Sequence, residues 1–228
     1  MSRNFELIDL SHSVEHGMIT YKGLPAPVIS DYLSREDSKT RYAPGTEFHI
    51  GKIEMVANTG TYLDSPFHRY ARGKDLAHLD LYSIANLDGL VVRCTALQDP
   101  AITEELFSEI DVRDKAVLVH TGWDQYWRTE EYSSGSHPFL TEGAASYLAK
   151  HGATLVGIDS FNIDATRDGN RPAHSVLLGH DIPIVEHLCG LGELPDTGFR
   201  FFAVPVKVRL FGTFPVRAFG IVTTVFTD

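Results

Sequence analysis

Short runs of β-branched and apolar residues, separated by turns, are the feature that most constrains the fold. Residues 89–97 (GLVVRCTAL) and 115–122 (KAVLVHTG) have the composition of buried strands, and residues 153–159 (ATLVGID) indicate another core strand. The alternation of apolar and polar residues in 48–57 (FHIGKIEMVA) predicts a half-buried strand. Further strand-like runs are residues 5–10, 201–210 and 217–226. Strands should therefore outnumber helices.

Helices are expected between some of these strands. Residues 141–151 (TEGAASYLAKH) predict a helix, because Thr141 can cap its start and Gly152 follows its end. The polar, charged residues 33–45 predict an exposed loop. Since no Ser/Gly/Pro-rich linker divides the chain, residues 1–228 are expected to form a single mixed α/β domain.

The charge balance and the cysteines narrow the function classes. Twenty Lys and Arg against thirty Asp and Glu give a net charge of −10, which argues against nucleic acid as a partner. The two cysteines, Cys94 and Cys189, cannot form a disulfide framework or a thiolate zinc site. No apolar run approaches about 18 residues and no signal peptide is apparent, so we expect a soluble, cytoplasmic protein without a membrane partner.

The segment 58–68 (NTGTYLDSPFH) carries the first group of candidate site residues. In an extended chain, Asn58, Tyr62 and Asp64 share one face because even numbers of residues separate them. His68 follows four residues after Asp64, beyond Pro66. A purely structural alternative is a turn over Asp-Ser-Pro that Asp64 caps.

A second group lies in residues 172–186 (PAHSVLLGHDIPIVE). His174 precedes a short apolar run, and Glu186 ends an apolar strand-like segment. A carboxylate at the end of a buried strand is a frequent position for a catalytic or ligating group. The alternative is a solvated glutamate at a strand terminus.

Together these segments resemble the cyclase family, which includes bacterial kynurenine formamidases and isatin hydrolases. The family signature is His-x-Gly-Thr-His-x-Asp-x-Pro-x-His, and this chain has Asn58 and Tyr62 at the first two histidine positions. The resemblance covers most of the chain, including residues 120–127, 136–159 and 172–195. It implies the swivelling β/β/α-like, mixed-sheet fold of that family.

The resemblance also implies a metal-dependent hydrolase that cleaves an amide-like bond (N-formyl, cyclic amide or lactone) in a small molecule. Asp64, His174 and Glu186 then correspond to ligands of one divalent ion, Zn²⁺ or Mn²⁺, and His68 to the acid–base residue. Asn58 and Tyr62 become polar groups of the substrate pocket, because an amide and an un-ionised phenol are poor ligands. The family further implies a homodimer or a larger homo-oligomer.

Two alternatives follow from the changed signature. The chain is either an altered member that binds a small molecule without catalysis, or a metal-free lyase or isomerase in which His68 is the base and Tyr62 the acid. Three aromatic residues, Trp123, Tyr126 and Trp127, are expected in a pocket wall, in the core or at an interface.

Overall fold

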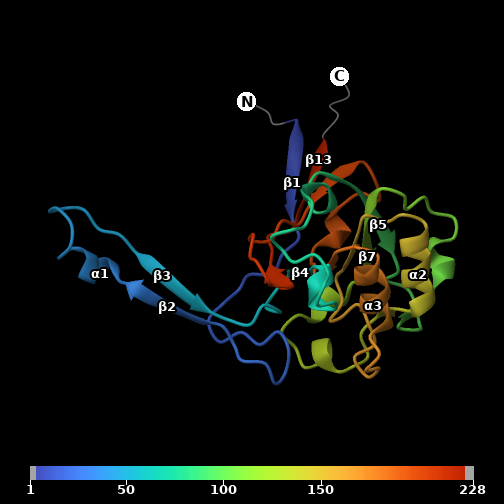
Figure 1. Ribbon diagram of the computed structural model, residues 1–228, viewed down its shortest axis with the longest axis horizontal. Coiled ribbons are helices and arrows are strands. Elements are labelled where there is room, and N and C mark those ends of the chain that lie inside the picture. Colours follow the sequence, from blue (N-terminus) through green and yellow to red (C-terminus); the bar gives the residue numbers. More distant parts are fainter. Residues whose placement is uncertain (1–3, 224–228) are drawn as a thin grey trace.

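The computed structural model describes residues 4–223, and a nine-stranded mixed sheet forms its centre (Figure 1). In their order across the sheet, the strands are β1 (Phe5–Asp9), β13 (Phe219–Thr223), β11 (Phe199–Phe202), β5 (Leu87–Arg93), β7 (Lys115–His120), β9 (Leu155–Ile158), β10 (Ile184–Glu186), β4 (Tyr62–Asp64) and β12 (Thr213–Pro215). Strands β5, β7, β9 and β10 pair in parallel, whereas the outer strands pair antiparallel.

The parallel strands are the core of the molecule. Their side chains alternate between two apolar clusters, so that Val117 and Val119 pack on one face and Leu118 on the other. The helices α2 (Glu142–Lys150) and α3 (Pro172–Gly179) cover the first face. The predicted buried strands in 89–97, 115–122 and 153–159 are confirmed, as is a mixed α/β fold with more strand than helix.

Helix α2 forms where the sequence predicted it. The Thr141 hydroxyl accepts a hydrogen bond from the Ala144 amide and caps the first turn. Ala144, Ala145 and Leu148 are buried on the face toward the sheet. Helix α3 was not predicted, because Arg171 before it offers no capping side chain.

An arm projects from the body on the side opposite to α2 (Figure 1). It consists of an antiparallel pair, β2 (Val28–Leu33) and β3 (Ile50–Glu54), with the short helix α1 (Arg35–Ser38) near its tip. The strand predicted in 48–57 forms as β3, but its expected half-burial is wrong, because every residue of β3 is exposed. Within β3 the two isoleucines, Ile50 and Ile53, lie on opposite faces, and Lys52 and Glu54 share the face of Ile50, so neither face is wholly apolar.

The C-terminal strand predictions are partly confirmed. Strand β11 ends at Phe202, and residues 203–210 form no strand. Pro205 in this segment has no amide hydrogen to donate to a neighbouring strand. Of the predicted strand 217–226, β13 covers residues 219–223, and residues 224–226 lie outside the described residues. The remaining elements are the pair β6 (Ala101–Ile102) and β8 (Phe139–Leu140), and the 3-10 helices η1 (Pro66–His68), η2 (Leu81–Ser83), η3 (Glu104–Phe107), η4 (Trp123–Tyr126), η5 (Glu131–Ser133) and η6 (Leu191–Glu193).

None of the helices between residues 4 and 223 combines the length and the apolar composition that crossing a membrane requires.

Candidate functional site

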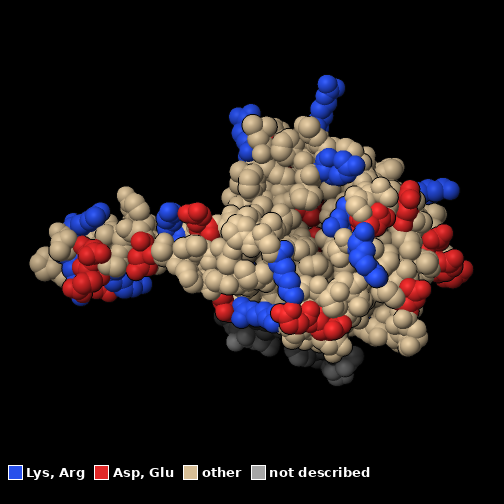
Figure 2. Space-filling view, turned by 90° about the horizontal axis from the view of Figure 1, so that it is seen from below, with Lys and Arg blue, Asp and Glu red and all other residues tan. Residues whose placement is uncertain are grey.

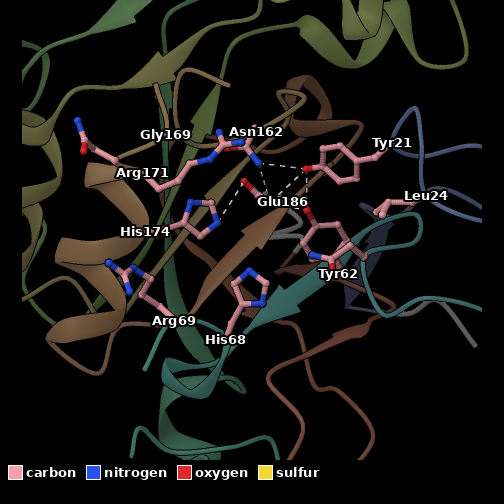
Figure 3. Close-up of a pocket in the computed structure, with 12 residues that line it drawn as sticks. Tyr21, Leu24, Tyr62, His68, Arg69, Asn162, Gly169, Arg171, His174 and Glu186 are labelled. Atoms are coloured by element: carbon pink, nitrogen blue, oxygen red, sulfur yellow. Dashed lines mark hydrogen bonds and ion pairs between the residues drawn. The ribbon is translucent and has the colours of Figure 1, made fainter. Parts of the chain in front are cut away.

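A cavity of about 320 Å³ opens where β4, β10 and the start of α3 meet (Figure 3). Its lining includes Asn58, Tyr62, His68, His174 and Glu186, which are five of the six candidate site residues. The sixth, Asp64, lies on β4 two residues after Tyr62 and contacts the lining residues from below the surface. The structure therefore brings both sequence segments to one place.

Asp64 is held by the strands on either side of it. It pairs in register with Ile184 of β10 and with Thr213 of β12, and it is fully buried. The Thr213 hydroxyl donates to Oδ1, whereas the buried Oδ2 has no hydrogen-bond partner. Asp64 does not cap a turn, since Ser65 holds the cap position of η1. An unpartnered carboxylate oxygen in the interior is unfavourable unless a cation lies beside it.

His174 faces Asp64 from the first turn of α3. Its Nδ1 lies 2.6 Å from Asp164 Oδ2, and the same carboxylate accepts the backbone amides of Ala173 and His174. This leaves Nε2 directed into the site, 3.6 Å from Asp64 Oδ2 and 3.8 Å from Glu186 Oε1. A carboxylate behind a histidine is the usual way in which proteins orient a metal-ligating imidazole.

The charge around His174 favours a cation. Burial alone lowers the pKa of His174, but Glu186, Asp164 and Asp64 outweigh burial and raise this pKa to about 10. Three carboxylates thus hold a proton on the imidazole. A divalent ion at Nε2 would balance the same negative charge, so the donor set fits a metal ion.

His68 completes the group from η1. Its Nδ1 lies 2.8 Å from the Thr213 hydroxyl and 3.6 Å from Asp64 Oδ1, and its side chain is 35% exposed. One ligand atom each from Asp64, His68 and His174 lie within 4.8 Å of one another, which is a spacing that can hold a metal ion.

Glu186 lies beside this group but is already hydrogen-bonded. Its Oε1 accepts the Ile163 amide at 2.6 Å, and its Oε2 accepts the Tyr62 hydroxyl, with Asn162 Nδ2 at 3.4 Å. Burial raises the pKa of Glu186, an effect that His174 opposes. Burial and the nearby Glu186 raise the pKa of Tyr62 well above its ordinary value, so the phenol keeps its proton and donates it.

The three candidate aromatic residues do not line this cavity. Trp123 and Tyr126 border a separate cavity. The Trp127 ring stacks on His12 with centroids 4.0 Å apart.

Comparison with known proteins decides the family. The family model described as "Putative cyclase" matches residues 8–165, which is more than half of the chain. The chain belongs to the cyclase family. Its similarity extends to kynurenine formamidases, with 26% identity over 218 residues to that of Bacillus cytotoxicus, covering 93% of this chain and 96% of the relative. The kynurenine formamidase of Geobacillus thermodenitrificans is 30% identical over 184 residues, covering 79% and 84% of the two chains.

A solved structure shares the fold. Isatin hydrolase A from Labrenzia aggregata, bound to benzyl benzoate, superposes with a TM-score of 0.81 at 21% identity, covering 96% of this chain and 94% of the other.

Several residues at the site of this cyclase-family chain escaped the sequence analysis. Asp164 and Asn162 follow β9, and Tyr21 enters from the N-terminal loop. A signal for the first two was present, because polar residues after a parallel strand gather at the carboxyl edge of a sheet. Tyr21 carries no such signal. The remaining lining residues that were missed are Leu24, Arg69, Gly169, Asn170 and Arg171.

Proposed function

We propose that this protein is a metal-dependent hydrolase that cleaves an amide-like bond, such as an N-formyl, cyclic amide or lactone bond, in a small molecule. The carrying observation is the buried, unpartnered Asp64 Oδ2 opposite His174 Nε2. The similarity to kynurenine formamidases, which are named for removing a formyl group from an amine, supports this reaction class. The proposal assigns the function to residues 1–228 as a single domain.

One divalent ion, Zn²⁺ or Mn²⁺, fits a site of Asp64, His174 and Glu186. All three side chains are at least nine-tenths buried, and a nitrogen with two carboxylates suits either ion. Glu186 contributes through Oε1, which faces His174 Nε2 at 3.8 Å and has a second lone pair besides the one that accepts the Ile163 amide. The chemistry that such an ion supplies is Lewis acidity, which polarises a carbonyl and makes water a better nucleophile near neutral pH.

His68 is the residue that moves a proton. Its Nδ1 is held by the Thr213 hydroxyl, which directs the ring and leaves Nε2 as the exchanging atom. The exposed part of the ring lets this proton pass to solvent or to the leaving group. His68 is partly exposed, whereas the three proposed ligands are buried. Its ring nitrogen still lies within 4.8 Å of the ligand atoms of Asp64 and His174, which is close enough to approach the ion.

Tyr62 and Asn58 form the substrate side of the pocket. Tyr62 donates to Glu186 and fixes that carboxylate, and Asn58 offers its amide at the cavity wall. A metal-free reaction with Tyr62 as the acid is less well supported, because its hydroxyl is buried and already donates to Glu186.

The test combines metal content with hydrolysis. Protein stripped with a chelator and reloaded should bind one Zn²⁺ or Mn²⁺ per chain, measured by elemental analysis, and should hydrolyse formanilide only when loaded. Failure to bind either ion, or bound metal without hydrolysis of any formanilide or lactone, would contradict the proposal.

The proposal includes a homodimer that forms through the arm. Large apolar side chains of the arm stand in solvent, including Tyr32 at 73% and Ile53 at 56% exposure. Acidic and basic residues lie interleaved along the same arm (Figure 2). A projecting apolar surface of this kind is typical of a segment that packs on a second copy.

The dimer has its own test. Light scattering should report twice the mass of 25.3 kDa for the wild type, and the double variant Tyr32→Ser, Ile53→Ser should be monomeric. The double variant Lys52→Ser, Glu54→Ser on the same strand is the matched control and should remain dimeric. A monomeric wild type would contradict the proposal. A cytoplasmic location is proposed as well, which agrees with the free thiols of Cys94 and Cys189 and which cell fractionation tests.

A further inference from the structure

A buried histidine that the proposed reaction does not use directly follows Glu186 in the chain. His187 is fully buried, and both of its ring nitrogens have a partner. The Tyr132 hydroxyl lies 2.7 Å from Nδ1, and the Tyr21 hydroxyl lies 3.1 Å from Nε2. Both partners are un-ionised phenols near neutral pH. Because a buried imidazolium needs an anion beside it and neither phenol supplies one, His187 is neutral and carries a single ring proton.

The backbone at His187 explains how two neighbouring residues reach the same point. Successive side chains of a strand point to opposite faces of the sheet. Strand β10 ends at Glu186, and His187 has a φ of 55°, in the left-handed region. This turn brings both side chains to the Tyr21 hydroxyl, which lies 3.5 Å from Glu186 Oε2 and 3.1 Å from His187 Nε2 (Figure 3). Left-handed backbone is uncommon outside glycine, and it concentrates at functional positions.

A chain of four contacts leads from this histidine's far side to the carboxylate. Its members, in order, are Tyr132, His187, Tyr21, Tyr62 and Glu186. The three phenols and the neutral imidazole carry four protons, which is one for each contact. With Glu186 as a carboxylate, every contact receives a proton only if Tyr132 donates to His187 Nδ1 and His187 Nε2–H donates to Tyr21. In the other tautomer the Tyr21 proton points back at His187, and one of the contacts of Tyr62 has no proton.

The Tyr21 hydroxyl is the junction of this chain. Asn162 Nδ2 donates to it at 3.1 Å, and together with His187 Nε2–H this fills both lone pairs of the oxygen. The Tyr21 proton has two acceptors close by, the Tyr62 hydroxyl at 2.8 Å and the Phe161 carbonyl at 3.0 Å. Because Tyr21 accepts twice, it can meet Tyr62 only as a donor. The Tyr62 proton is then left for the carboxylate.

We propose that His187 is a positioning residue that acts through Tyr21 and Tyr62 on Glu186. By donating to Tyr21, the imidazole makes Tyr21 a donor to Tyr62, and Tyr62 a donor to Glu186 Oε2. A carboxylate held at Oε2 keeps Oε1 directed at the ion site, 3.8 Å from His174 Nε2. The inference rests on the proposed function where it assigns Glu186 to the ion, whereas the direction of the chain does not depend on that function.

The tautomer of His187 tests the direction of the chain in metal-free protein. Nitrogen-15 NMR distinguishes a protonated from a bare imidazole nitrogen, and the spectrum of His187→Gln identifies which signals belong to His187. We expect the proton on Nε2 and a bare Nδ1. A proton on Nδ1, or on both nitrogens, would overturn the proposal. The measurement needs neither a bound ion nor hydrolysis, so its result stands even if the proposed function fails.

Metal affinity tests whether the chain acts on Glu186. Competition titration with a chelator gives Kd for Zn²⁺. Tyr21→Phe and His187→Leu should each raise Kd about fivefold, which is less than the loss of a ligand's direct partner causes. Because His187 acts through Tyr21, the double variant should also show about fivefold, whereas independent effects would multiply to about 25-fold. His187→Gln, whose amide N–H can replace Nε2–H, should retain the wild-type Kd.

His12→Phe is the matched control for damage to the surrounding aromatic group. The His12 ring stacks on Trp127, which contacts His187, and its Nε2 has no hydrogen-bond partner. This variant should keep the wild-type Kd. If His187→Leu does not fold, Tyr132→Phe takes its place, because it removes the donor to Nδ1.

Three outcomes of the titration would overturn the positioning role: an unchanged Kd in His187→Leu, multiplied effects in the double variant, or an equal loss in the His12→Phe control. Protein that binds no Zn²⁺ would contradict the proposed function and the role toward the ion together. The tautomer of His187 would then still decide the direction of the chain.

Discussion

The two sides of the pocket use similar polar residues but differ in how those residues are hydrogen-bonded. On the tyrosine side (Tyr21, Tyr62 and Glu186) the groups satisfy one another, since the two hydroxyls lie 2.8 Å apart and Tyr62 donates to Glu186. On the histidine side (Asp64, His68 and His174) Asp64 Oδ2 lacks a donor. The missing partner indicates that a ligand is expected on the histidine side, toward which Glu186 also faces with Oε1 at 3.8 Å from His174 Nε2.

The pKa values of two buried histidines, His187 beside the tyrosine side and His174 on the histidine side, show the same contrast. His187, hydrogen-bonded to Tyr21 and Tyr132, has its pKa lowered well below 6.5, first by burial and then by His12 and His137. His174 has its pKa raised to about 10 by the surrounding carboxylates. The two buried imidazoles therefore prefer different charge states, His187 the neutral form and His174 the protonated form.

The largest effect should come from Asp64→Asn, which removes the unpartnered carboxylate. We expect loss of the bound ion and a fall in kcat/KM of about 10³-fold, because a ligand and its charge are both lost. In chelator near neutral pH the variant should be less stable than the wild type, since the protonated His174 loses one of the carboxylates that face it. Elemental analysis, formanilide kinetics and urea unfolding measure the three quantities. Asp88→Asn, which changes an exposed carboxylate on β5, serves as control. An Asp64→Asn variant that keeps its ion would mean that the histidine side does not hold the metal.

Asp164→Asn tests the same comparison at a residue that holds His174 but does not itself contact the proposed ion. The neutral amide still reaches His174 but no longer fixes its tautomer or increases its basicity. Metal affinity should fall by about 10- to 100-fold while the stoichiometry stays at one ion. Competition titration against a coloured chelator measures this change. An unchanged affinity would show that Asp164 only caps α3.

On the tyrosine side, Tyr62→Phe should affect stability more than metal binding. The variant leaves Glu186 Oε2 without its phenol donor and should lower the free energy of unfolding by about 1 to 3 kcal/mol. The metal stoichiometry should not change. Urea unfolding and elemental analysis test both statements, and a variant that loses its ion would place Tyr62 on the functional side of the comparison.

The last prediction concerns the pH dependence of stability in metal-free protein. His187 is neutral when folded, so its contribution is present above pH 6.5 and is lost as the pH falls below that value. His174 is protonated when folded, so its contribution is present below pH 6.5 and is lost as the pH rises toward 10. His187→Gln should therefore flatten the acid limb of the stability profile, and His174→Gln the alkaline limb. If each variant flattened the opposite limb, the contrast between the two imidazoles would be wrong.

Local patterns were sufficient to predict the central part of the fold. The β-branched runs became β5, β7 and β9, and Thr141 caps α2 as predicted, because these features depend on neighbouring residues alone. The even spacing of Tyr62 and Asp64 placed both on one face of β4. Their meeting with His174 was suggested only by the family resemblance, since over one hundred residues separate them in the chain.

The features that the sequence did not predict depend on distant contacts. Helix α3 begins at Pro172 with no capping side chain of its own, and the carboxylate that accepts its first amides comes from Asp164. Strand β3 forms as its pattern predicted, but its burial depends on what packs against the β2–β3 pair. A single sequence carries no local signal for either fact.

The position of Asp64 between two paired strands limits how this site can change during evolution. Because Asp64 is in register with Ile184 and Thr213 at once, adding or deleting one residue in β4 would turn Leu63 or Ser65 into the pocket and Asp64 into the opposite apolar layer. A one-residue insertion or deletion in β4 would therefore dismantle the site, whereas exchange of single side chains keeps its register. If Asn58 and Tyr62 correspond to histidines of the family signature, as the sequence resemblance implies, they are changes of this kind.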